Sequence, residues 1–202
     1  MHAKGESGKM SAKRIVLLLV LFICSLSLLF AEEVNPNLNY SFTFHLGHSV
    51  NANSDYHFEI WDTSNRKISS VNLSSGTHNI GSFVVTFSGS ITIPHIYAIF
   101  EALTSIEAND QGVYDCYPFS MYVYEPGSTI VVDNPIATDL LTVEGKRHTV
   151  GTIEFSNMAF QKQYSYMDWD SRKIADFTIV LDDEEVRPGT YSGNVVISTE
   201  GP

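Results

Sequence analysis

The sequence predicts an all-β protein built as a sandwich of short antiparallel strands. In most segments after residue 39, apolar and polar residues alternate with a period of two, as in strands with one buried face. Runs rich in Asn, Asp, Ser and Gly separate these segments and favour turns. Many short alternating strands with frequent turns are typical of an antiparallel sandwich or barrel.

The first 31 residues have the pattern of a signal peptide. A basic stretch precedes the apolar run 15–30, and Glu32 follows Ala31 directly. The run is short for a membrane-spanning helix. We therefore predict cleavage near Ala31 and a periplasmic, cell-surface or secreted chain whose residues 32–202 form a single domain. A lipid anchor at Cys24 is the alternative, although the residue before it is not small.

Composition excludes several classes of function. Without residues 1–31 the chain keeps 22 acidic and eight basic residues, a net charge of −14. Such a body repels nucleic acids and anionic membranes. Cys116 is then the single cysteine, so we expect no internal disulfide and a buried structural thiol.

The first half of this region contains regular strand patterns. Segments 40–48, 55–62 and 82–90 alternate, and segment 116–133 is predicted to form two strands joined by a turn at Pro126–Gly127. The residues predicted to face the core are Tyr40, Phe42, Phe44, Leu46, Tyr56, Phe58, Ile60, Phe83, Val85, Phe87, Tyr117, Phe119, Met121 and Val123.

Residues 96–108 carry a different pattern. Ile96, Ile99, Phe100, Leu103 and Ile106 recur at helical spacing. One short helix near 96–108 and a buried strand are both compatible with this segment.

The last strands are predicted over 150–155, 176–182 and 190–198, with Phe177 and Ile179 in the core. The closing stretch RPGTYSGNVVIS resembles the last strand of bacterial extracytoplasmic immunoglobulin-like and pilin-like β-sandwich domains, which carry P-G-T-Y-x-G-x-V-x-[IV]. This resemblance implies an antiparallel immunoglobulin-like β-sandwich. It places Tyr191 at a corner, Gly193 beside a close neighbour and segment 175–186 as the hairpin partner of the last strand.

The same resemblance implies a fimbrial-like, adhesive or other binding module rather than an enzyme. Residues 32–46 could act as a donor strand in strand-exchange self-assembly, because their apolar residues alternate. An ordinary first strand of the chain's own sheet has the same pattern.

Aromatic residues give the candidate binding face. They crowd the middle and later chain, and Tyr122, Tyr124, Tyr166 and Trp169 are predicted to contact a protein or glycan partner at the cell surface. Tyr164 belongs to the same aromatic-rich region.

Candidate catalytic and metal sites are sparse. Asp168 and Asp170 share a face if extended and could bind calcium weakly or act as an acid–base pair. His45 and His48 would point to opposite faces of a strand. No phosphate-binding glycine loop or nucleophile motif is present, so we expect no cofactor.

The sequence therefore predicts a non-enzymatic, secreted or cell-surface β-sandwich acting in adhesion, binding or surface assembly. Two alternatives are a small eight-stranded outer-membrane β-barrel and a secreted carbohydrate-active hydrolase on a sandwich scaffold.

Overall fold

A computed structural model describes residues 40–48, 55–181 and 186–202. All of these residues belong to one compact unit. The predicted signal peptide, its cleavage site at Ala31 and residues 32–39 of the predicted donor segment lie outside the described residues.

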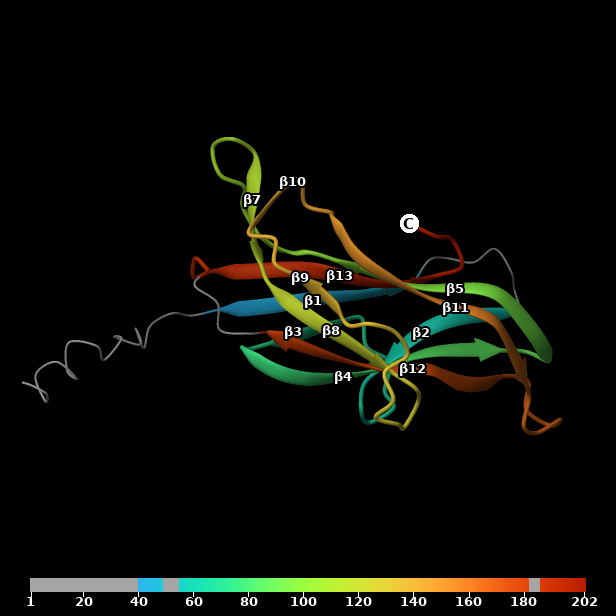
Figure 1. Cartoon of the computed structure of the whole chain (residues 1–202). Helices are drawn as coiled ribbons and strands as arrows, with labels where there is room; N and C mark the ends of the chain where they lie inside the picture. The colour runs from blue at the N-terminus through green and yellow to red at the C-terminus, as the bar shows by residue number, and fades with distance from the viewer. Residues whose placement is uncertain (1–39, 49–54, 182–185) are drawn as a thin grey trace, which may run out of the picture. The chain divides into compact units, whose positions relative to one another are not determined.

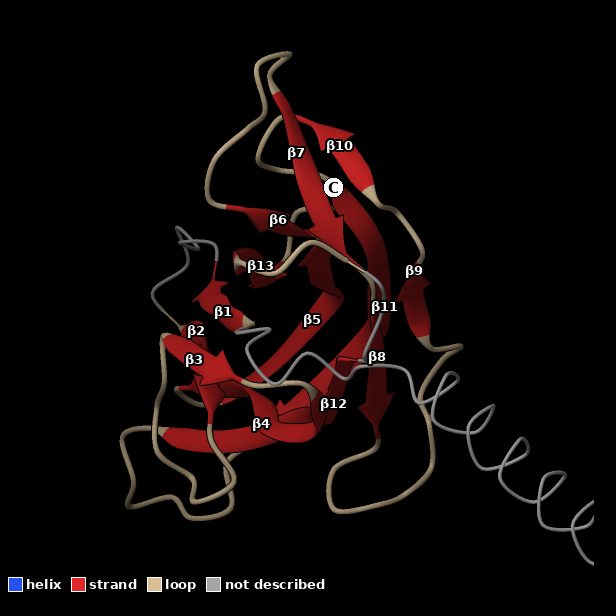
Figure 2. Cartoon of the chain, turned by 90° about the vertical axis from the view of Figure 1, so that its left-hand side faces the viewer, coloured by secondary structure: helices blue, strands red, loops and turns tan. Residues whose placement is uncertain are grey.

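The described residues form two β-sheets that pack as a sandwich, as the alternation predicted (Figures 1 and 2). The first sheet contains eight strands: β10 (Thr142–Glu144), β7 (Val113–Tyr117), β6 (Leu103–Ser105), β13 (Thr190–Ser198), β1 (Ser41–His48), β3 (Ser70–Leu73), β5 (Ser90–Glu101) and β11 (Thr149–Gln161). The second contains five: β2 (Tyr56–Trp61), β4 (Gly76–Phe87), β12 (Asp170–Leu181), β8 (Phe119–Tyr124) and β9 (Ile136–Thr138).

Alternating side chains of both sheets fill the space between them. On β12, Phe177 and Ile179 are fully buried, and Phe177 stacks on Phe83 of β4 with ring centroids 4.5 Å apart. Phe100 of β5 meets Phe83 from the opposite sheet, with ring centroids 6.3 Å apart. These aromatic residues join the two layers into one core.

The possible helix near residues 96–108 does not form, because β5 and β6 occupy this part of the described chain. Ile96, Ala98 and Phe100 are buried, whereas Tyr97 and Ile99 between them are only partly buried. The period is therefore two. Branched Ile side chains fit a pleated sheet better than a helix, and pairing with β11 and β13 supplies the backbone hydrogen bonds.

The predicted hairpin between segment 175–186 and the last strand is also wrong. Strand β12 pairs with β4 and β8 in the second sheet, whereas β13 pairs with β1, β5 and β6 in the first. Both strands bury one face in the core. Their alternation of apolar and polar residues is therefore the same whether they pair in one sheet or lie in opposite sheets.

The predicted corner at the start of β13 is present. The Tyr191 side chain is 1% exposed, and its hydroxyl donates a 2.5 Å hydrogen bond to the backbone carbonyl of Arg187. A Cβ atom on Gly193 would stand 3.0 Å from the carbonyl oxygen of Ala102, so glycine permits the close approach of this neighbouring backbone.

Strand β1 lies within the first sheet, between β13 and β3. It pairs with β13 in parallel over eight residues, from Ser41–Thr190 to His48–Ile197, and with β3 in antiparallel. The part of the predicted donor segment that is described is thus a strand of its own sheet.

Candidate functional site

Exposed aromatic side chains gather on the loop between β11 and β12, residues 162–169, which we call the aromatic loop. Tyr166 is 76% exposed, and Tyr164 and Trp169 are each 43% exposed. Met167 adds a fourth large apolar side chain with 38% of its surface exposed. Contiguous exposed apolar groups of this kind typically mark contact sites for partners.

Asp170, the first residue of β12, holds the base of this loop. One carboxylate oxygen accepts the Gln163 backbone N–H at 2.8 Å, and the other accepts the Ser171 N–H at 2.8 Å. Arg172 contacts both oxygens, at 3.0 and 2.9 Å. The Gln163 hydrogen bond, supported by Ser171 and Arg172, lowers the pKa of Asp170 despite its burial.

The tip of the loop has its own contacts. The Lys162 ammonium group donates to the Met167 carbonyl, and the Met167 N–H donates to the Tyr164 carbonyl at 3.4 Å. The rings of Tyr164 and Tyr166 stack with centroids 5.4 Å apart. The exposed rings are therefore presented on a braced loop, which lowers the entropy lost when a partner binds.

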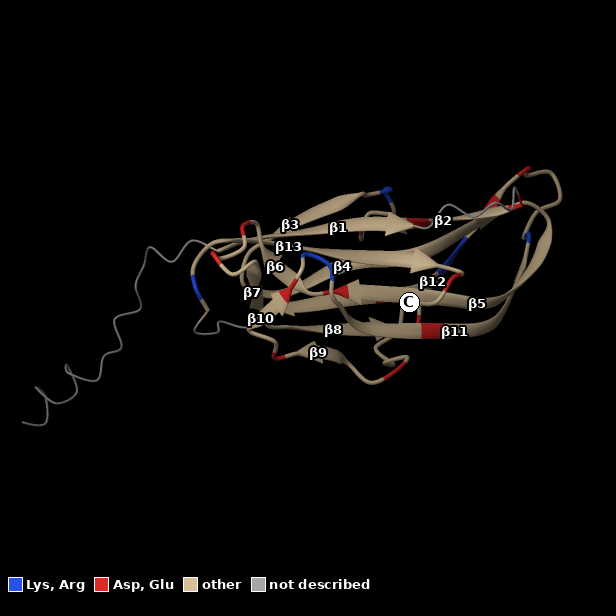
Figure 3. Ribbon diagram, turned by 90° about the horizontal axis from the view of Figure 1, so that it is seen from above, with Lys and Arg blue, Asp and Glu red and all other residues tan. Residues whose placement is uncertain are grey.

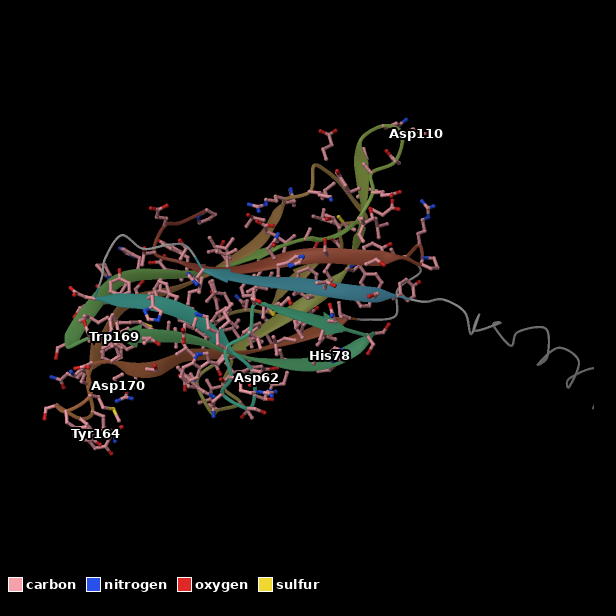
Figure 4. The ribbon with its side chains drawn as sticks, turned by 180° about the vertical axis from the view of Figure 1, so that it is seen from behind. Asp62, His78, Asp110, Tyr164, Trp169 and Asp170 are labelled. Carbon is pink, nitrogen blue, oxygen red and sulfur yellow. The ribbon has the colours of Figure 1, made fainter. Side chains whose placement is uncertain are left out.

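Trp169 connects the loop to the second sheet. Its ring lies 5.5 Å from the ring of His57 on β2, centroid to centroid. Figure 4 shows Trp169, Asp170 and Tyr164 at the same end of the unit. His57 therefore belongs to the edge of the candidate contact surface.

The predicted binding face divides into two clusters. Tyr166 and Trp169 lie on the aromatic loop, whereas Tyr122 and Tyr124 stack on each other on β8, with ring centroids 6.5 Å apart. Tyr124 pairs with Asp176 of β12, seven residues beyond Trp169. At 3.3 Å per residue this separates the clusters by about 23 Å along the strand.

Sequence reasoning missed Met167 and His57 as parts of this surface. Met167 was detectable, because it stands between Tyr166 and Trp169 in YSYMDW. His57 was not, since its proximity to Trp169 depends on the pairing of β2 and β12 with the two sides of β4.

Asp168 and Asp170 lie in different surroundings. Asp168 is exposed, while both carboxylate oxygens of Asp170 are engaged by Arg172 and backbone N–H groups. Within the described ranges no group of three or more His, Cys, Asp or Glu residues is placed to hold a metal ion. A calcium ion would have to compete with Arg172 and the backbone N–H groups for the Asp170 oxygens. A general acid would need a raised pKa, whereas the pKa of Asp170 is lowered.

Cys116 is 1% exposed, and burial together with the nearby Asp115 carboxylate raises the pKa of its thiol to about 11. Nucleophilic cysteines need the opposite shift. Its surroundings are those of a structural core residue.

Charged residues lie in the loops at both ends of the sheets and at single positions within the strands, as on β11 (Figure 3). Among the described residues, no helix is long and apolar enough to span a bilayer.

Comparisons with protein-family models, curated proteins and solved structures find no match to this chain.

Proposed function

We propose that this protein is a non-enzymatic, extracytoplasmic binding module that works in adhesion or surface assembly through its aromatic loop. The observation that carries the proposal is the exposure of Tyr164, Tyr166 and Trp169 on a loop braced by Asp170. Tyr and Trp are the side chains most enriched at binding hot spots, because each offers a large apolar area with few rotatable bonds.

The location rests on the leader pattern of residues 1–31, and the binding role is also supported by the resemblance of the closing strand to immunoglobulin-like and pilin-like domains. The acidic balance of the chain supports a partner with a neutral or basic surface. Tyr122 and Tyr124 form a second, smaller aromatic cluster and are assigned no part in the primary contact.

The experiment is a retention assay on the source cell's own envelope. Labelled protein, purified after expression of the full chain with its leader, is added to washed envelope preparations and to immobilised neutral oligosaccharides. A Tyr164→Ser/Tyr166→Ser/Trp169→Ser variant is compared with the unmodified protein.

Ile130→Ser is the matched control, because Ile130 is 59% exposed on the separate loop between β8 and β9. We expect the triple variant to lose retention while the control keeps it. Equal retention of the triple variant and the unmodified protein on every surface would refute the proposal.

A further inference from the structure

The aromatic loop has the side-chain chemistry of the boundary between a lipid bilayer and water. Its exposed large side chains are Tyr164, Tyr166, Met167 and Trp169, which all lie between positions 164 and 169. Tyr and Trp are enriched at that boundary, because each combines an apolar ring with a polar group that stays hydrated. Contiguous exposed apolar groups mark contact sites for membranes as well as for proteins.

The shape of the loop favours an extended surface as its partner. The loop projects beyond the ends of β11 and β12, and Tyr164 lies at the margin of the molecule (Figures 1 and 4). Tyr166 is 76% exposed, more than any other large hydrophobic side chain of the described residues. Sites for small molecules are concave. A convex apolar tip instead fits a soft, nearly planar layer that can close around it.

The charge of the loop region differs from that of the rest of the chain. Segment 162–173 contains the cations Lys162, Arg172 and Lys173 and the anions Asp168 and Asp170, a net charge of 3 − 2 = +1. The remainder of residues 32–202 therefore carries −14 − 1 = −15. At physiological ionic strength, exposed charges more than about 8 Å apart are largely screened from each other. This end of the molecule can thus approach lipid phosphates while the acidic remainder stays in water.

Asp168 limits how deep the loop can enter. Its side chain is exposed between Met167 and Trp169, and transfer of a carboxylate into hydrocarbon is costly. The Trp169 ring also lies beside His57 of β2, so deeper entry would take a polar side chain of the second sheet out of water. The depth that satisfies all these groups is the headgroup layer, with the rings at the start of the acyl chains.

We propose that the aromatic loop inserts shallowly into a lipid bilayer, so that the partner of this binding module is a lipid surface. This inference rests on the proposed binding role of the loop and names its partner. Tyr166 enters first, the other large apolar side chains of the loop lie among the headgroups, and Asp168 stays hydrated. Because Asp170 braces the base of the loop, the rings are already exposed before contact.

The first test is co-sedimentation with phosphatidylcholine vesicles at physiological ionic strength, using the protein purified from full-chain expression. The unmodified protein should bind. Tyr166→Ser should lower the partition coefficient by about tenfold or more, because the ring loses its apolar contact with the bilayer. The triple variant Tyr164→Ser/Tyr166→Ser/Trp169→Ser should not bind, whereas the surface control Ile130→Ser should bind normally. All these proteins share the same N-terminal region, so a difference between them comes from the substitutions.

Tryptophan fluorescence shows which part of the molecule meets the lipid. Trp61 and Trp169 are the two tryptophans of the chain. Trp61 stands at the opposite end of β2 from Tyr56, whose partner Phe87 also pairs with Asp170 at the base of the loop. The two rings therefore report on different parts of the surface.

In Trp61→Phe, vesicle binding should shift the Trp169 emission to shorter wavelength. Lipids brominated near the headgroup should quench this emission more strongly than lipids brominated near the chain terminus. In the matched variant Trp169→Phe, the Trp61 emission should change little. If Trp61→Phe does not fold, the difference between the spectra of the unmodified protein and Trp169→Phe isolates Trp169.

Three results would overturn the inference: an unmodified protein that does not bind vesicles, a triple variant that binds them equally well, or a bound protein whose Trp169 emission is not quenched by brominated lipid. If vesicles are not bound but the triple variant loses retention on envelopes or oligosaccharides, the partner is a protein or a glycan. The lipid inference then fails and the proposed binding function stands.

Discussion

Replacing Tyr191 by Phe removes one hydroxyl from the corner that starts β13. At neutral pH the Arg187 carbonyl loses its 2.5 Å hydrogen bond. Arg187 is itself exposed, so water can partly replace the hydroxyl. We therefore expect the free energy of unfolding to fall by about 1–2 kcal/mol, near the middle of the range for a lost buried hydrogen bond.

The same substitution has an opposite effect at high pH. Burial, reinforced by the Asp115 carboxylate, raises the pKa of Tyr191 to about 12. Above pH 10 the unfolded chain loses this proton while the folded chain keeps it, so rising pH destabilises the unmodified protein and spares the Phe variant. One pKa unit corresponds to about 1.4 kcal/mol, so the stability difference between the two proteins should be nearly abolished by pH 11.

Urea unfolding of both proteins at several pH values between 7 and 11 measures this difference directly. Tyr166→Phe is the control, because Tyr166 is exposed and its substitution should leave stability unchanged at every pH. A difference between the unmodified protein and Tyr191→Phe that stays constant from pH 7 to 11 would show that the phenol is not held neutral by burial.

Three further predictions concern other parts of the fold. Gly81→Ala should lower the free energy of unfolding by about 3 kcal/mol or more, because φ is +144° and the new Cβ would stand 1.9 Å from the Trp61 carbonyl oxygen. Gly89→Ala is the control: its Cβ would meet open space, so the free energy of unfolding should fall by only about 1–2 kcal/mol. Thermal unfolding of the two variants measures the difference. Cys116 should resist alkylation in the folded protein at pH 8 and react fully in urea, and rapid native labelling followed by mass spectrometry would contradict its burial. The lowered pKa of Asp170 means that its contribution to stability is present at neutral pH and is lost as pH falls below about 4, so unfolding of Asp170→Asn should be less sensitive to acid; identical acid sensitivity would argue against the network with Gln163 and Arg172.

The regular strands were predictable because their alternation reflects burial on one side. Phe42 and Phe44 on β1 and Phe177 and Ile179 on β12 are all in the core, as the period of two indicated. The helix at 96–108 was a wrong alternative because Ile and Phe also satisfy a two-residue period, and local spacing cannot show that β11 and β13 lie on either side of β5.

The short strands and the full length of β11 were harder to predict from the sequence. Strands β6, β9 and β10 have three residues each, too few to show a period. In β11 the pattern was recognised only to Phe155, and Asn157 then adopts a left-handed backbone conformation opposite Pro94 of β5 before pairing resumes at Met158. The irregular backbone at Asn157 interrupts the alternation of apolar and polar residues, while pairing with β5 continues the strand on both sides.

The candidate site was partly predictable. Tyr166 and Trp169 were identified from the aromatic density of one segment, and the structure places both on an exposed loop. The sequence grouped these two residues with Tyr122 and Tyr124 on one face, whereas the structure places the two pairs apart along β12. This separation could not be predicted, because a sequence does not show which strands are neighbours. The ion pair between Asp170 and Arg172 could not be predicted either, because a sequence does not show whether two polar residues of one strand contact each other.

The parallel pairing of β1 with β13 has a mechanical consequence. Tension that enters through the residues before Ser41 and leaves through those after Ser198 would pull the two strands lengthwise in opposite directions. Their eight paired positions would then bear the load together instead of opening one after another from an end. A load applied between these two ends would therefore be resisted first at this strand pair, and the core behind it would stay folded until the pair had sheared.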